Sequence, residues 1–170
     1  MTGGEIPREE LLGLFEAARW APSASNLQPW RALFARRATP EWPLFFGLLA
    51  AGNQAWAHNA AALVVFVSHS ISERTGRPSV THSYDTGAAW GYFALQGYLR
   101  GYAVHGMAGF DYERARRELA IPEAFRIEAM AAVGRPAPKE TLPPDLQARE
   151  IPSDRKPVQE WACEGSWRLA

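Results

Sequence analysis

The chain has 170 residues, a length that suits one domain, and its 18 basic and 18 acidic side chains give a formal net charge of zero. This balance, without a lysine-rich arm, argues against general nucleic-acid binding, and no apolar stretch approaches the ~20 residues that a membrane span needs. The first ten residues lack a secretory-signal pattern and Cys163 is the only cysteine, so we expect a cytoplasmic protein without internal disulfides, folded as a single domain over residues 1–170.

The first half of the chain predicts a helix, two strands and a loop. Residues 8–20 place apolar side chains on one helical face, and Pro22 ends this helix. WRALFARR (30–37) predicts a short strand, and 44–61 predicts a short helical segment after two prolines. LVVFVSH (63–69) is typical of a strand buried on both faces, whereas the polar residues 70–83 indicate a surface loop.

The second half begins with a central helix over 84–102. Its small strip of Gly87, Gly91 and Ala94 would pack either in the core or against another helix. Residues 102–111 predict a strand that runs into a glycine-containing loop, and Asp111 is the expected N-cap of a helix over 112–120. Residues 126–134 predict another strand, and the chain after Pro136 is proline-rich and irregular. Strands separated by helices indicate a sheet covered by helices.

No motif for side-chain catalysis is present. The sequence lacks G-x-G-x-x-G, G-x-x-x-x-G-K-[ST], H-E-x-x-H and G-x-S-x-G. Its four histidines, His58, His69, His82 and His105, have no metal-ligand spacing, and we expect structural or surface roles for them. We therefore predict no catalytic side chain and no metal site, and we expect an organic cofactor to supply any reaction chemistry.

The stretch APSASNLQPW (21–30) is the strongest local signal for ligand binding. We expect Pro22 and Pro29 to hold the residues before them extended, and the hydroxyl and amide groups between them offer both donors and acceptors. Such a loop suits the polar edge of a flat heterocycle. The alternative is a turn after a helix, in which serine and asparagine satisfy free backbone groups.

Six segments in order resemble the nitroreductase-like family of FMN-dependent NAD(P)H oxidoreductases. They are AARWAPSASNLQPWRALF, NAAALVVFVS, YDTGAAWGYFALQGYLRGY, GMAGFD, AMAAVGRPAP and DRKPVQEW, and the resemblance spans about residues 8–161. It implies an α+β nitroreductase-like fold, in which helices cover a central, mostly antiparallel sheet. It also implies a homodimer with FMN at the subunit interface and NAD(P)H as the reductant.

The resemblance also implies which residues bind FMN. The loop of Pro22, Ser23, Ala24, Ser25 and Asn26 would reach the flavin held by the partner subunit, with Gln28 close by. The loop of Gly106, Met107, Ala108 and Gly109 would lie over one face of the ring, where glycine lets the backbone approach closely. Asn53 would lie near the pyrimidine side, although a polar residue near a helix N-terminus is an equally good explanation. Arg155 would pair with the phosphate.

Two departures from the family pattern concern the phosphate. The Arg-Arg-Ser-x-Arg segment expected ahead of the first helix is missing, so we expect the N-terminal family segment to be absent. Ser153 and Trp56 stand where relatives carry cations. Both departures predict a weakened phosphate site.

The implied function is electron transfer from NAD(P)H to a small-molecule acceptor, such as a nitroaromatic or a quinone, by a ping-pong mechanism. The alternatives are a flavin-binding or interaction module without turnover, and a relative with other flavin chemistry, such as reductive dehalogenation or flavin breakdown.

Overall fold

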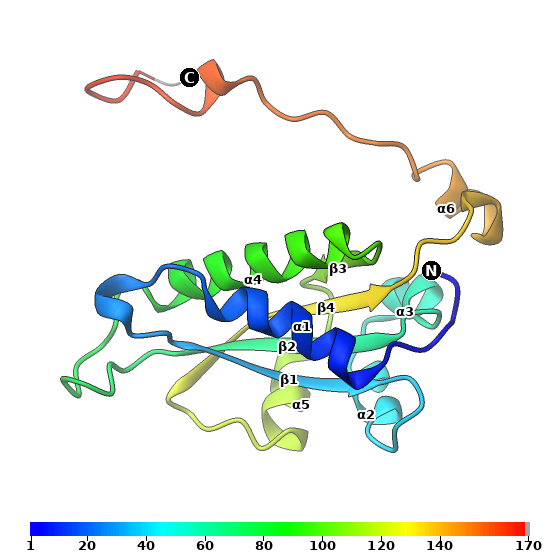
Figure 1. Cartoon of the computed structure of the whole chain (residues 1–170), viewed down its shortest axis with the longest axis horizontal. Coiled ribbons are helices and arrows are strands. Elements are labelled where there is room, and N and C mark those ends of the chain that lie inside the picture. The colour runs from blue at the N-terminus through cyan, green and yellow to red at the C-terminus, as the bar shows by residue number, and fades with distance from the viewer. Residues whose placement is uncertain (169–170) are drawn as a thin grey trace. The chain divides into compact units, whose positions relative to one another are not determined.

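The computed structural model describes residues 1–168 (Figure 1). The chain divides into two compact units, Met1–Ala137 and a unit that begins at Pro138. The prediction of a single domain over 1–170 stays a prediction. Within the described residues, no helix combines the length and the apolar character needed to cross a bilayer.

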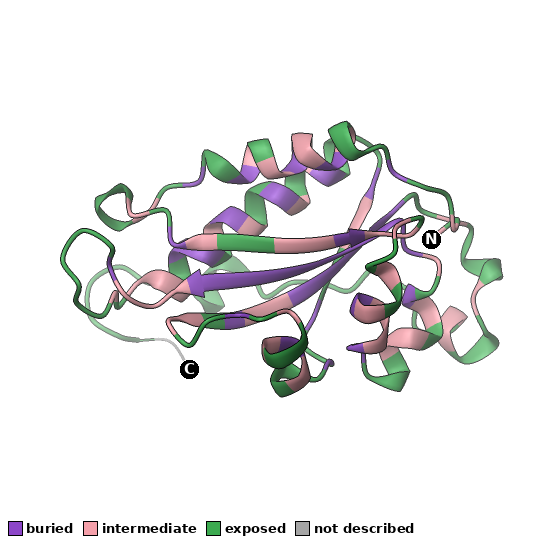
Figure 2. Cartoon of the chain, turned by 90° about the horizontal axis from the view of Figure 1, so that it is seen from below, coloured by how far each residue is buried: buried purple, intermediate pink, exposed green. Residues whose placement is uncertain are grey.

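A four-stranded sheet forms the centre of the first unit. Its strands are β1 (Trp30–Arg36), β2 (Ala62–His69), β3 (Ala103–Met107) and β4 (Phe125–Gly134), in the order β1-β2-β4-β3. All three pairings are antiparallel, which confirms the predicted sheet. The inner strand β2 is buried along nearly its whole length, as its continuous run of apolar residues predicts (Figure 2).

Helices cover both faces of this sheet, so the unit has two separate apolar cores (Figure 2). On one face, α1 (Arg8–Arg19) and α4 (His82–Leu99) pack on alternate residues of β2 and β4, such as Val64 and Ala131. On the other face, α2 (Trp42–Gly47), α3 (Ala51–Ala57) and α5 (Tyr112–Glu118) cover the intervening residues, such as Val65 and Met130. Period-two alternation along the strands separates these two sets.

The expected elements are present, with one difference in the first half. The single helical segment predicted over 44–61 is two helices, because the chain between them pairs with the segment before α5. Leu49 forms a bridge with Phe110, and the backbone N–H of Ala50 donates to Gly109 O at 3.0 Å. The predicted N-cap of α5 is confirmed, since the Asp111 carboxylate accepts the Arg114 backbone N–H at 2.9 Å.

The second unit has little regular structure, as its prolines predict. It contains α6 (Pro144–Gln147) and two short 3-10 turns, Lys139–Thr141 and Val158–Glu160. Its described residues are almost all exposed, including the large apolar side chain of Trp161.

Candidate functional site

The first group of predicted site residues forms the loop after α1, residues 22–28, which we call the polar loop. It contains a single 3-10 turn over Ala24–Asn26, and Ser23, the residue before this turn, has an extended backbone. Ser25, Asn26 and Gln28 have positive φ angles of 50°, 54° and 47°. Residues other than glycine rarely adopt this left-handed backbone conformation, so the polar loop stores backbone strain.

The expectation that Pro29 holds the preceding residue extended is wrong for Gln28, whose φ is 47°. Local hydrogen bonds compensate for this conformation. The Gln28 backbone N–H donates to Ser23 Oγ at 3.0 Å, and the Gln28 side-chain amide donates to Asn26 O at 3.3 Å and to Asn26 Oδ1 at 3.2 Å. Three of the predicted ligand side chains therefore also stabilise the loop itself.

The polar loop is attached to the first turn of α4. The backbone N–H of Ala24 donates to Asp85 Oδ2 at 3.1 Å, and Thr81 Oγ1 donates to the same oxygen at 3.0 Å. Asp85 is only 3% exposed, whereas Ser25 and Asn26 lie on the surface. The loop thus presents two polar side chains to solvent, while the buried Asp85 carboxylate holds its backbone.

The second group is the segment after β3, Gly106–Gly109, which we call the glycine loop. Gly106 and Met107 pair with β4, and Met107 is buried, whereas Ala108 and Gly109 are exposed. The Asn53 side-chain amide of α3 donates to Gly109 O at 2.9 Å, so the structure brings Asn53 and this loop together. Within residues 1–168, the backbone N–H groups of Ala108 and Gly109 have no acceptor.

Close packing explains why two positions of the glycine loop lack a side chain. A Cβ atom at Gly106 would lie 3.0 Å from Trp90 Cζ2, and one at Gly109 would lie 2.9 Å from Asn53 Nδ2. The indole Nε1 of Trp90 is buried and has no hydrogen-bond partner in the described chain, like Thr86 Oγ1 one turn earlier. Orphan donors of this kind are uncommon in folded proteins.

Arg155, the predicted phosphate ligand, lies in the second unit. Its Nη1 donates to Ser153 O and Ser153 Oγ, each at 2.9 Å, and to Asp154 O at 3.1 Å. The guanidinium is exposed and is held by its own segment.

The outer face of α4 carries exposed apolar side chains beside glycines. A Cβ atom added at Gly87 or at Gly91 would meet no described atom within 4 Å, so packing in the core of this chain, one of the two explanations for the small strip, is wrong for both. Leu95 and Tyr98, on the same face, are 59% and 76% exposed. Large exposed apolar patches mark interaction surfaces.

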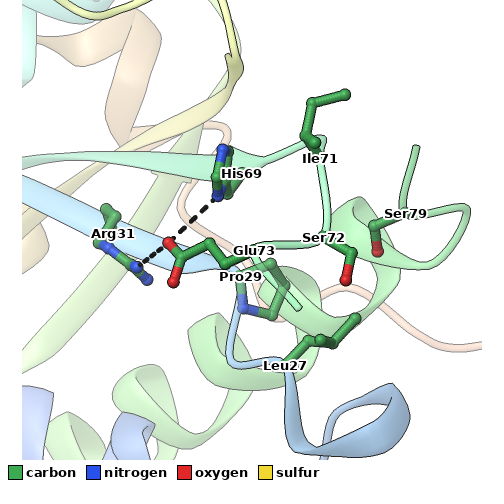
Figure 3. Close-up of a pocket in the computed structure, with 8 residues that line it drawn as sticks. All are labelled: Leu27, Pro29, Arg31, His69, Ile71, Ser72, Glu73 and Ser79. Atoms are coloured by element: carbon green, nitrogen blue, oxygen red, sulfur yellow. Dashed lines mark hydrogen bonds and ion pairs between the residues drawn. The ribbon is translucent and has the colours of Figure 1, made fainter. Parts of the chain in front are cut away.

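A small hollow lies beside the end of the polar loop (Figure 3). Leu27 and Pro29 form one side of it, and Glu73 reaches across to form an ion pair with Arg31 at 3.1 Å, while Glu73 Oε1 also lies 3.3 Å from His69 Nδ1. Because Glu73 and Arg31 are largely exposed, their ion pair contributes little stability. It does connect the loop after β2 to the strand that follows the polar loop.

The histidines make structural contacts. His82 Nδ1 lies 2.7 Å from Ser68 Oγ, and the Ser68 hydroxyl donates to Glu128 Oε1. The ring of His69 stacks on Phe125 with their centroids 4.5 Å apart. The ring of His105 lies 4.6 Å from that of Trp56. No group of three or more His, Cys, Asp or Glu side chains in residues 1–168 is placed to hold a metal ion.

Sequence reasoning missed Asp85 and Trp90, which contact the two loops from α4. A signal for Asp85 was present, because a carboxylate in the first turn of an otherwise apolar helix needs a partner. Trp90 offered no such signal, since a tryptophan in an apolar helix is ordinarily predicted to be a core residue.

Comparisons with known proteins agree with this architecture. Residues 3–41 match the model of the nitroreductase family. The crystal structure of an oxidoreductase containing FMN superposes with a TM-score of 0.95 at 45% identity, covering 99% of this chain and 87% of that one. The NADH dehydrogenase of Thermus thermophilus is 30% identical over an alignment 160 positions long, which covers 78% of this chain and 78% of that one.

More distant solved structures share the fold. A nitroreductase family protein from Streptococcus pneumoniae superposes with a TM-score of 0.74 at 20% identity, covering 95% of this chain and 92% of that one. The match to the family model, together with the 45% and 30% identical relatives described above, shows that the chain belongs to the nitroreductase family of oxidoreductases.

Proposed function

We propose that this protein is an FMN-dependent oxidoreductase that takes electrons from NAD(P)H and passes them to an electron-poor small molecule, such as a nitroaromatic or a quinone. The observation that carries the proposal is the 45% identity, over 99% of the chain, to an oxidoreductase that contains FMN. A cytoplasmic location stays a prediction from the sequence.

The two loops suit a flat ring with a polar edge. Ser25 and Asn26 are exposed, and hydrogen bonds to Asp85 and Ser23 hold the backbone of their loop before any ligand arrives. The backbone N–H groups of Ala108 and Gly109 are free donors within the described residues. Gly109 also lies close to Asn53, because an added Cβ atom there would meet the Asn53 side chain. Oriented backbone donors stabilise negative charge that develops on a bound group.

Each predicted residue has a role in this proposal. Ser23, Ser25 and Asn26 hydrogen-bond the polar edge of the ring or the ribityl chain, with Pro22, Ala24 and Gln28 shaping their loop. Asn53 fixes the glycine loop through Gly109 O and lies near the pyrimidine side. The backbone of Gly106, Met107, Ala108 and Gly109 covers one face of the ring, and Arg155 pairs with the phosphate.

FMN, when bound, supplies the redox chemistry by accepting hydride from NAD(P)H and passing electrons to the second substrate. The protein binds and orients the ring, leaves one face open for stacking, and supplies donors from the glycine loop. In this proposal both substrates stack in turn on the same open face of the ring, so the kinetics are ping-pong. No side chain needs to act as an acid or base.

The proposal includes a homodimer, in which the polar loop of one copy contacts the ring held by the other. The exposed apolar face of α4, with the small residues Gly87 and Gly91 in the middle, supports close helix packing against a second copy. The polar loop is fixed to the first turn of this same helix, so covering the face of α4 brings the loop to the partner.

Titration of cofactor-free protein with FMN, with light scattering in parallel, tests the proposal. We expect saturable binding, a dimer, and parallel double-reciprocal plots when NADPH and a quinone are varied together. A colourless monomer after soaking in excess FMN overturns the proposal, and FMN binding without turnover favours the binding-module alternative.

Leu95→Arg tests whether the α4 face forms the dimer without changing the fold of the single chain. Burying a charge in an apolar contact is unfavourable, so we expect this variant to be monomeric and to lose FMN while keeping its circular dichroism spectrum. The matched control is Val80→Arg, which changes a 96% exposed residue outside α4 and leaves dimer and cofactor intact.

A further inference from the structure

The polar loop needs a fixed anchor, because its backbone is strained. Ser25, Asn26 and Gln28 are three of the four non-glycine residues with positive φ in the described part of the chain. Such conformations persist only where surrounding contacts enforce them. The hydrogen bonds between Ser23, Asn26 and Gln28 are internal to the loop, so they fix its shape but not its place on the protein.

Asp85 supplies an attachment from outside the loop. Its Oδ2 accepts the backbone N–H of Ala24 at 3.1 Å, across 61 positions of sequence, and also the hydroxyl of Thr81 at 3.0 Å. Among the described residues, Asp85 is the only buried charged side chain. A hydrogen bond to a buried carboxylate is stronger than one between neutral groups, and the first turn of α4 favours negative charge.

The position of this contact in the loop matters. Ala24 immediately precedes Ser25 and Asn26, the two exposed side chains with positive φ. The Asp85 carboxylate therefore holds the backbone directly before these two residues. Loss of the contact would release the turn without removing any ligand atom.

We propose that Asp85 is a positioning residue for the cofactor: its buried carboxylate holds Ala24 and thereby aims Ser25 and Asn26 outward. This inference rests on the proposed function, since the aimed side chains are the proposed flavin ligands. Asp85 itself does not touch the ring. It acts through the loop, and within the proposed dimer it acts on the ring held by the partner.

Asp85→Asn tests the proposal because it keeps the shape of the side chain and removes its charge. We expect the Kd for FMN to rise about tenfold, the size of effect expected when a charge-assisted hydrogen bond becomes a weaker, neutral one. Turnover at saturating FMN should stay within about twofold of the parent, because the ligand atoms remain. Thr81→Val, which removes the second donor and leaves the Ala24 contact, should raise the Kd about threefold.

Hydrogen exchange of the cofactor-free protein gives a readout independent of flavin. In Asp85→Asn, the peptide covering residues 21–30 should exchange faster, while peptides from β2 stay unchanged. The matched control is Thr86→Val, which alters the adjacent buried residue, whose hydroxyl has no partner in the described chain. It should change neither the Kd nor the exchange of 21–30.

Three results overturn the inference: an Asp85→Asn Kd within twofold of the parent, unchanged exchange of 21–30, or an equal loss of affinity in Thr86→Val. If Asp85→Asn does not fold, Thr81→Val decides, and an unchanged Kd overturns it. Failure of the parent protein to bind FMN contradicts the proposed function instead, and the exchange comparison still tests the Asp85 anchor.

Discussion

At the scale of single residues, backbone strain is concentrated where ligand binding is proposed. Of the described non-glycine residues with positive φ, only Ala120 lies outside the polar loop. A turn chosen for stability alone would use glycine at such positions. Ser25 and Asn26 instead keep polar side chains there, which is the pattern of a site that gives up stability for function.

Ser25→Gly tests this trade-off. Relief of the left-handed strain should outweigh the greater flexibility of glycine in the unfolded chain, so the free energy of unfolding of the cofactor-free protein should rise by about 0.5–1 kcal/mol. FMN affinity should fall, because the hydroxyl is lost. Urea unfolding and FMN titration measure the two effects.

The control for this change is Ser79→Gly, at a serine outside the left-handed region. It should lower the free energy of unfolding by about 0.5–1 kcal/mol, because nothing offsets the added flexibility. A Ser25→Gly protein that unfolds as easily as Ser79→Gly would show that residue 25 is not strained.

At the scale of secondary-structure elements, the α4 helix has two distinct sides. Its inner side packs against α1 and the sheet, where Phe93 and Gly97 are fully or almost fully buried. Gly97 is required there for space, since an added Cβ would lie 2.5 Å from Val104 Cγ2. Glycine on the outer side has no neighbour in the described chain and so has a different reason to be present.

Gly97→Ala should therefore destabilise the protein despite the better helix propensity of alanine. We expect the free energy of unfolding to fall by about 1–3 kcal/mol, the usual cost of overpacking. Gly52→Ala is the matched change in α3, where the added methyl meets no described atom within 4 Å, and it should raise stability by up to about 1 kcal/mol. Equal midpoints in urea for the two variants would contradict the packing argument.

Apolar periodicity and turn residues were sufficient to predict every strand and the long helices from the sequence. The continuous apolar run of residues 63–69 predicts a buried strand, and both faces of β2 are indeed covered. Asp111 was predicted as an N-cap from its residue type and position, and α5 begins just after it. The break between α2 and α3 was not predictable, because it depends on pairing with Phe110, far along the chain. The anchoring of the polar loop by Asp85 depends on a tertiary contact in the same way.

At the scale of the whole first unit, α1, β3 and β4 are joined by one polar cluster. The Tyr102 hydroxyl donates to the Glu10 carboxylate, and the Arg135 guanidinium lies 3.9 Å from the centre of the Tyr102 ring. Arg135 also pairs with Glu10 at 3.6 Å. Burial raises the pKa of Tyr102 above its ordinary value, the bond to Glu10 raises it further, and Arg135 partly opposes both.

This raised pKa predicts how stability depends on pH. The folded state favours the protonated phenol, so the contribution of Tyr102 is fully present below its ordinary pKa of about 10 and is lost as the pH rises through the higher folded value. Tyr102→Phe should cost about 1 kcal/mol at pH 8 and should lose less stability between pH 10 and 11 than the parent. Urea midpoints across this range measure the effect, and parallel curves would contradict it.

The polar loop and the glycine loop are fixed to helices on opposite faces of the sheet, the first to α4 and the second to α3. In the proposed dimer, each cofactor combines the glycine loop of one copy with the polar loop of the other. A hybrid molecule, in which one copy is damaged only in its polar loop and the other only in its glycine loop, would then collect both defects at one cofactor and leave the other unharmed. Mixing two inactive variants would restore activity through complementation between subunits.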